Sequence, residues 1–90
     1  MPSKTWGNNM VIFTKHAKDK FEVLRRHGFL VSKDQVLRTL EYPELIDHSR
    51  YPLLIAQKQV SRKYILRVVF SKKSDIMKVI TFYPKLLKRQ

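Results

Sequence analysis

The sequence YILRVVFSKKSDIMKVITFYP, residues 64–84, decides the fold, because it reads as two apolar strands joined by a short polar turn. Arg67 stands inside the first apolar run, where a charged side chain is costly to bury unless a partner neutralises it. Thr81 and Tyr83 lie near the end of the second run. If the register places these three side chains on one face, the hairpin presents a cationic, hydroxyl-rich site that suits a phosphate group.

The length of the turn sets this register, because side chains alternate between the two faces of a strand. A two-residue loop at 72–73 would place Arg67 opposite Lys78, and like charges in that position repel. It would also lack the Asn-Gly type of sequence that tight hairpins prefer. A three-residue loop at 72–74 places Arg67 opposite Val79 and on the same face as both hydroxyl side chains. We therefore predict the three-residue loop. The alternative is that Arg67 extends to a sheet edge and has no chemical role.

Upstream of the hairpin, the sequence predicts a short strand at residues 10–13 and then a helix from about residue 15 to 27. The Thr14 hydroxyl is suited to cap the start of this helix, and Gly28 is suited to end it. The spacing of three apolar residues along the helix predicts one buried stripe. The stripe consists of Ala17, Phe21 and Leu24.

A second helix is predicted from a capping box, in which Ser32 is the N-cap and Gln35 the third helical residue. The helix is expected to run to about Glu41, because Pro43 cannot continue it. Its apolar face consists of Val36, Leu37 and Leu40.

Short strands are predicted next, at residues 44–47 and 53–60, and Pro84 is expected to end the last strand because proline cannot donate to the ladder. Closely spaced strands pair antiparallel. The fold class is therefore predicted as α+β, in the order β-α-α-β-β-β, with two helices packed on one face of a twisted antiparallel sheet of three to five strands. Residues 1–9 are predicted to form a polar extension, and residues 10–90 a single domain.

The composition fits one small folded domain, with 90 residues of which 43% are hydrophobic. The chain has no cysteine, which excludes disulfides and thiolate metal sites. Its apolar runs are far shorter than the roughly 20 residues of a membrane helix, and its start lacks the apolar core of a signal peptide. We therefore expect a cytoplasmic protein with no membrane partner.

Basic residues are concentrated in the second half of the chain. The whole chain has 19 Lys and Arg against 7 Asp and Glu, a net charge of +12. Residues 48–90 contain eleven basic residues and one acid, Asp75, whereas residues 1–47 contain eight basic residues and six acids. Such asymmetry indicates an electropositive face that attracts a polyanion. Nucleic acid is the favoured partner and an acidic protein the alternative.

His16 is the candidate acid or base of the chain. It is expected near the start of the first helix, where the helix dipole disfavours the imidazolium form. The alternative is an exposed histidine without a function. His16 and His27 would lie roughly 16 Å apart along this helix, too far to share a metal ion. No HExxH motif or glycine-rich phosphate loop is present, so we expect neither a metal nor a cofactor.

Six motifs of the chain occur in a characteristic order and spacing. They are FTKHAKDKF, HGF, VSKDQV, IAQK, LRVVF and VITFYP. Together they resemble a small prokaryotic domain family of uncharacterised function that is related to the BrnT-like and RelE-like toxins of toxin–antitoxin systems. The resemblance covers roughly residues 11–89.

The resemblance implies a compact α+β fold, metal-independent RNA cleavage and an acidic antitoxin as partner. It implies four catalytic residues. His16 would be the acid or base and Tyr83 its partner, while Arg67 and Thr81 would stabilise the charge that develops on the phosphate. The cations expected to bind RNA are Lys15, Arg62, Lys63, Lys85 and Arg89.

The tail of the chain departs from the family pattern. The family continues after Tyr-Pro with paired arginines and an Arg-Tyr ending, whereas residues 85–90 read KLLKRQ and only Arg89 keeps the pattern. This departure favours a second hypothesis, a non-catalytic basic module that binds RNA or an acidic protein. A third hypothesis is an adaptor that acts through an apolar surface, for which the candidates are Trp6, Leu86 and Leu87.

Overall fold

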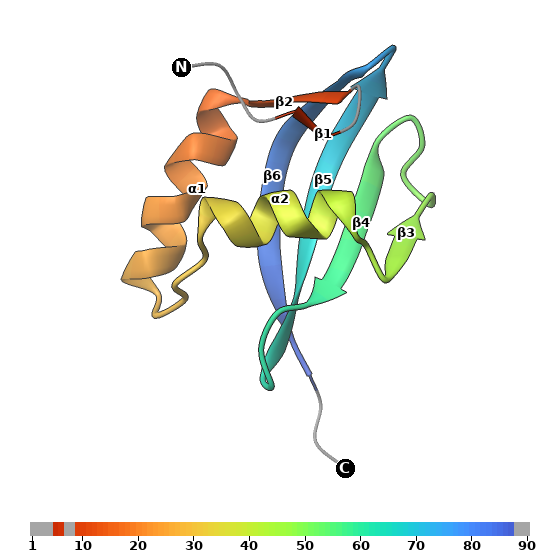
Figure 1. Cartoon of the computed structure of the whole chain (residues 1–90). Helices are drawn as coiled ribbons and strands as arrows, with labels where there is room; N and C mark the ends of the chain where they lie inside the picture. The colour runs from red at the N-terminus through yellow and green to blue at the C-terminus, as the bar shows by residue number, and fades with distance from the viewer. Residues whose placement is uncertain (1–4, 7–8, 88–90) are drawn as a thin grey trace.

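The computed structural model describes residues 5–6 and 9–87 and forms one mixed sheet with two helices (Figure 1). The sheet order is β1-β2-β6-β5-β4-β3. The α+β class and the two helices are as predicted. None of the described helices is long and apolar enough to cross a membrane. The elements are β1 (Thr5–Trp6), β2 (Asn9–Phe13), α1 (Lys15–Arg26), α2 (Lys33–Glu41), β3 (Leu45–Asp47), β4 (Leu54–Gln59), β5 (Tyr64–Lys73) and β6 (Ile76–Leu86).

The local signals at the ends of both helices are confirmed. The Thr14 hydroxyl accepts a hydrogen bond from the backbone N–H of Ala17 at 3.1 Å and caps α1. Gly28 follows the helix with a φ of 87°, in the left-handed region that glycine adopts without strain. Both hydrogen bonds of the capping box form between Ser32 and Gln35 at the start of α2.

The sheet is mixed, and the prediction of a purely antiparallel sheet is wrong. Strands β3 to β6 form the expected antiparallel meander. The first long strand, β2, lies on the far side of β6 and pairs with it in parallel, with Val11 opposite Met77. The chain between β2 and β6 holds both helices and the other three strands, so the two strands meet through a long crossover, which permits parallel pairing.

The predicted three-residue loop is also wrong. Lys73 pairs with Ile76, so the turn consists of Ser74 and Asp75, and Ser74 has a φ of 59°. Positive φ in this position is typical of tight two-residue hairpins. The turn therefore lies further along the chain than the loop at 72–74 that was expected, and the strands are longer.

Arg67 lies opposite Tyr83 rather than Val79, because the turn lies further along the chain and a β-bulge adds one residue to β6. Phe70 pairs with Val79 and Val69 with Thr81, so Ile80 is an extra residue in β6. A regular hairpin with this turn would place residue 82 opposite Arg67 and turn the hydroxyl side chains to the other face. The bulge thus produces the predicted grouping of Arg67, Thr81 and Tyr83 on one face.

Thr14 holds the bulge in place. Its hydroxyl donates to the carbonyl of Ile80 at 3.1 Å, and its backbone N–H donates to the carbonyl of Val79 at 3.1 Å. The same hydroxyl accepts from Ala17 at the start of α1. One side chain therefore joins the end of β2, the start of α1 and the bulge of β6.

The ends of the sheet differ from the prediction in two places. Pro84 does not end β6, which continues to Leu86. Beyond Val79, β6 has a strand neighbour on one side only, since β2 ends opposite that residue, and proline is tolerated on such an edge. The predicted extension at residues 1–9 is in part a strand, because Thr5 and Trp6 of β1 pair with β2.

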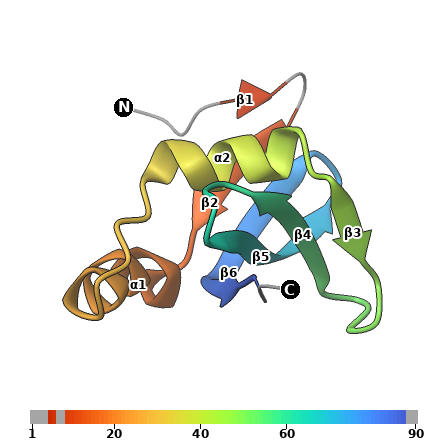
Figure 2. The same cartoon turned by 90° about the horizontal axis from the view of Figure 1, so that it is seen from below.

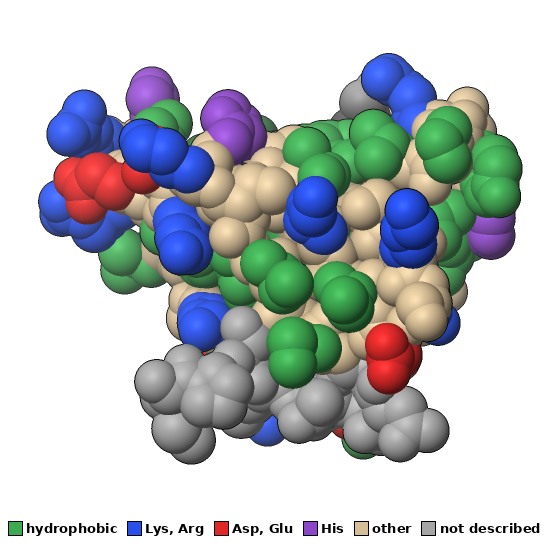
Figure 3. Space-filling model, turned by 90° about the horizontal axis from the view of Figure 1, so that it is seen from above, with side chains coloured by type: hydrophobic (Ala, Val, Ile, Leu, Met, Phe, Trp, Pro, Cys, Tyr) green, Lys and Arg blue, Asp and Glu red, His purple; other side chains and the backbone are tan. Residues whose placement is uncertain are grey.

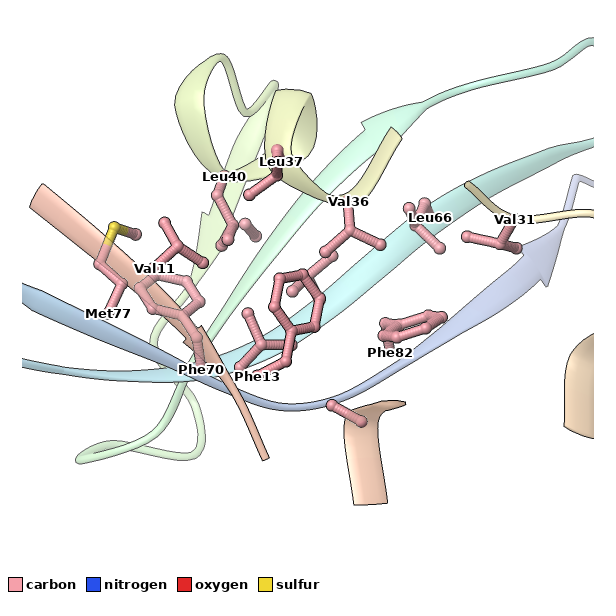
Figure 4. Packing of buried hydrophobic residues seen from close by; sticks show 14 of the residues in the cluster. Val11, Phe13, Val31, Val36, Leu37, Leu40, Leu66, Phe70, Met77 and Phe82 are labelled. Atoms are coloured by element: carbon pink, nitrogen blue, oxygen red, sulfur yellow. The ribbon is translucent and has the colours of Figure 1, made fainter. Parts of the chain in front are cut away.

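The hydrophobic core lies between the helices and one face of the sheet (Figure 4). The helix α1 packs along β6 and β2, and α2 lies across β4 and β5 (Figures 1 and 2). Phe82 is fully buried, and its ring lies 4.6 Å from that of Phe21 on α1. Among the described residues no helix covers the opposite face, which carries the side chains that alternate with the core.

Candidate functional site

A pocket of about 530 Å³ opens on the uncovered face of the sheet. It lies where the loop after β3 approaches the middle of β4, β5 and β6, next to the bulge. Its lining holds both charged and apolar side chains. The lining residues are Asp47, Ser49, Arg50, Leu53, Ile55, Arg67, Val69, Ile80, Thr81 and Tyr83.

Arg67 is fixed at the centre of the site by three hydrogen bonds. Its Nε donates to the Tyr83 hydroxyl at 2.9 Å, Nη1 donates to Oε1 of Gln57, and Nη2 donates to a carboxylate oxygen of Asp47 at 3.1 Å. Its side chain is only 14% exposed. Burial opposes the charged form, but the hydrogen bonds with Tyr83 and Asp47 outweigh it and raise the pKa of Arg67. Two of its five N–H groups remain for a ligand.

Asp47 is a structural anion and a poor base. Its carboxylate accepts from the Ser49 hydroxyl and backbone N–H and from Arg67, and these bonds lower the pKa of Asp47 to about 2. A general base acts best with a pKa near the working pH, which is far above this value. Asp47 therefore neutralises Arg67 and orients it, and the lining keeps a net charge of +1 through Arg50.

The remaining polar groups of the pocket are donors. The Tyr83 oxygen accepts from Arg67, which leaves its own O–H free to donate. The Thr81 hydroxyl is buried and has no hydrogen-bond partner among the described residues. An unpaired buried hydroxyl is unfavourable, and a group that accepts its proton would relieve this cost. An anion with several oxygens fits this set.

One side of the pocket is apolar. Strand alternation turns Ile55 and Val69 to the same face as Arg67, and Leu53 and Ile80 complete the wall. A ligand that fills the pocket therefore combines an anionic group with an apolar or planar part. A nucleotide has both.

The predicted site residues separate into two groups. Arg67, Thr81 and Tyr83 line the pocket together, as their predicted common face requires. His16 is exposed on α1 and is not among the lining residues, so its catalytic role stays a prediction.

The predicted RNA-binding cations that the structure describes lie outside the pocket. Lys15 is exposed on α1 and pairs with Asp19 at 3.2 Å. Arg62 and Lys63 are exposed in the turn before β5, and Lys85 is exposed on β6. Arg89 lies outside the described residues, as does part of the tail, and the structure describes no side chain for Trp6.

Three residues of the candidate site were not predicted from the sequence. Asp47 and Gln57 are the partners of Arg67, and Arg50 supplies the second cation. The sequence did hold a signal for Gln57, because an arginine inside a strand needs a polar partner on a neighbouring strand. Gln57 lies two residues from Ile55 and therefore on the same face of β4, directly opposite Arg67. Arg50 lies in a loop, where periodicity gives no signal.

Comparisons with known proteins give no relative for this chain. No family model matches it, and neither a curated protein nor a solved structure is significantly similar.

Proposed function

We propose that this protein binds single-stranded RNA and holds one nucleotide unit in the pocket around Arg67. The observation that carries the proposal is the surplus of donors there. Two arginines and two hydroxyls face a site whose one carboxylate is already saturated by Ser49 and Arg67. A phosphodiester accepts hydrogen bonds and donates none, so it suits this lining.

The rest of the pocket and the charge of the chain support RNA over a simple anion. The apolar wall of Leu53, Ile55, Val69 and Ile80 offers a surface for a base, whose faces are poorly hydrated. The net charge of +12 attracts a polyanion before contact. Single-stranded RNA fits better than a duplex, because its bases can leave the stack and enter a pocket.

Binding is tested with a short fluorescein-labelled single-stranded RNA by anisotropy over a series of KCl concentrations. We expect log K to fall with log[salt] with a slope of about −0.7 for each phosphate contacted. Arg50→Gln should weaken binding by about tenfold or more, the loss of one charged hydrogen bond of about 1.5 kcal/mol or more.

Arg26→Gln is the matched control, because it removes the same charge from an exposed position on α1. It should weaken binding by less than about twofold, since exposed charges distant from the contact are screened. Equal loss in the two variants would refute the pocket as the binding site, and affinity that ignores salt would refute RNA binding through phosphates.

Metal-independent RNA cleavage is the second candidate function, as the resemblance to RelE-like and BrnT-like toxins implies. Arg67, Thr81 and Tyr83 favour it, because a guanidinium and two hydroxyls can stabilise a pentacoordinate phosphate. The low pKa of Asp47 disfavours it, since the pocket itself then supplies no base. The assay is RNA cleavage in EDTA by the wild type, His16→Ala and Tyr83→Phe. Intact RNA in all three leaves binding as the function, and equal cleavage in all three excludes His16 and Tyr83 as catalytic residues.

A further inference from the structure

A second surface lies on the uncovered face of the sheet, beside the pocket and toward β2. Three large apolar side chains are exposed there: Met10 and Ile76 at 41% and Ile12 at 38%. Met10 is the pairing partner of Ile76, and Ile12 is the partner of Lys78 on the neighbouring strand. The three therefore form one contiguous apolar patch across β2 and β6.

Two lysines border this patch, against one acid, Asp75 in the adjoining turn, so the border keeps a net charge of +1. A hollow of about 470 Å³ is lined by Ile12, Ser71, Lys73, Ser74, Ile76 and Lys78. Lys73 lies opposite Ile76, and Lys78 lies opposite Ser71, so the cations flank the apolar side chains on β5 and β6. Viewed from the end of the molecule that carries β2 and the β5–β6 turn, hydrophobic and basic side chains are interspersed, and acidic ones lie at the margins (Figure 3).

The side chains of the patch favour an acidic protein segment over RNA and over a second copy of the chain. RNA bases stack on aromatic side chains or on the plane of an arginine, and neither lines this hollow, whereas the pocket around Arg67 offers Arg50, Arg67 and Tyr83. A second copy of the chain would bring another +12 charge against the lysines, which is repulsive. An apolar centre with a charged border is the usual anatomy of a protein interface, and here the border calls for carboxylates.

We propose that this surface, residues 10, 12, 73, 76 and 78, binds an acidic amphipathic segment of another protein. Apolar side chains of that segment enter between Ile12 and Ile76, and its carboxylates pair with Lys73 and Lys78. The surface shares no lining residue with the pocket around Arg67. The proposal therefore stands or fails independently of RNA binding.

The test uses the full chain, labelled with ¹⁵N, and a synthetic peptide that carries leucines along one helical face and glutamates elsewhere. A peptide of the same composition with scrambled order is the control ligand. We expect saturable shifts of the amide signals of residues 10–12 and 76–78 with the first peptide and far weaker binding of the second.

Two variants localise the contact. Ile76→Thr should weaken the binding of the peptide by about fourfold or more, since it removes apolar surface from the contact. Val23→Thr is the matched control, because Val23 is 42% exposed on α1, and it should leave the affinity unchanged. Both variants are first shown to melt within a few degrees of the wild type.

Several results would overturn the proposal. They are the absence of saturable binding, equal affinity for the scrambled peptide, or equal effects of the two variants. A single-stranded RNA that shifts the same amide signals and displaces the peptide would assign the surface to RNA. A dimer in sedimentation whose interface contains residue 76 would assign it to a second copy.

Discussion

Replacing Thr81 by valine should make the protein more stable and weaken its binding of ligand. The Thr81 hydroxyl is buried beside Arg67 and Tyr83 and has no hydrogen-bond partner among the described residues. Valine has the same branched shape and the same preference for strands, so the substitution exchanges the hydroxyl for a methyl group with little change in packing. The two effects have opposite signs, which is typical of a binding group that is unfavourable in the free protein.

The size of the stability effect follows from the environment of the hydroxyl. An unsatisfied buried hydroxyl costs about 1–3 kcal/mol relative to one in water, and a methyl group at that position has no such cost. We expect Thr81→Val to raise the free energy of unfolding by about 1–2 kcal/mol, the lower part of that range. In a domain of this size, each kcal/mol raises Tm by about 4–8 °C.

Thr39→Val is the matched control. Thr39 is also buried, with 0% exposure, but its hydroxyl donates to the carbonyl of Gln35 at 2.8 Å. Its removal loses a hydrogen bond worth about 1 kcal/mol, so this variant should gain nothing or be less stable. Urea unfolding gives both free energies, and RNA anisotropy gives the affinities. A Thr81→Val variant that is less stable than the wild type would refute the unpaired hydroxyl, and unchanged affinity would refute its role as a donor to the ligand.

Three further predictions concern the supports of the fold and the site. Thr14→Val should lower the free energy of unfolding by about 2 kcal/mol, since it removes both a helix cap and the bond to the Ile80 carbonyl. Thr14→Ser keeps the hydroxyl and should retain most of the wild-type stability, and urea unfolding measures both variants. Asp47 has its pKa lowered from 3.8 to about 2 in the folded protein, so its ionised form adds stability that is complete above about pH 5 and is lost as the pH falls to about 2. The stability difference between the wild type and Asp47→Asn should therefore close over this range in denaturant titrations, and a constant difference would contradict the assignment. Gly28→Ala should cost about 1–2 kcal/mol, because alanine is strained at a φ of 87° although its methyl group would meet no atom within 4 Å; a calorimetric melt without a change in Tm would disprove this.

The helices of this fold could be predicted because their signals are local. The Ser32–Gln35 box and the Thr14 cap depend on residues three apart, and both form as predicted. Gly28 takes the positive φ that a helix end requires. Each signal involves one short stretch of chain, so no knowledge of the tertiary structure was needed.

The sheet and the site required contacts between distant residues. The parallel pairing of β2 with β6 joins Val11 to Met77, and nothing in either strand specifies the other. The bulge at Ile80 depends on a bond from Thr14, 66 residues earlier. The common face of Arg67 and Tyr83 was therefore predicted correctly from a wrong loop length, because the bulge compensates for the shorter turn.

The extra residue in β6 determines which changes in the length of this hairpin would keep the site intact. β6 has 11 residues and its partner β5 has 10, and Ile80 accounts for the difference. A chain without this residue could pair Arg67 with Tyr83 through a regular ladder, so a gap of one position here would preserve the site. One residue added to the turn would lengthen the loop and leave Lys73 opposite Ile76, because the buried face and the pairing with β2 hold β6 in register. One residue added between Ile76 and Val79, in contrast, would turn either the core residues or the site residues of β6 to the wrong face. The site therefore depends on the number of residues within β6 outside the bulge and not on the length of the turn.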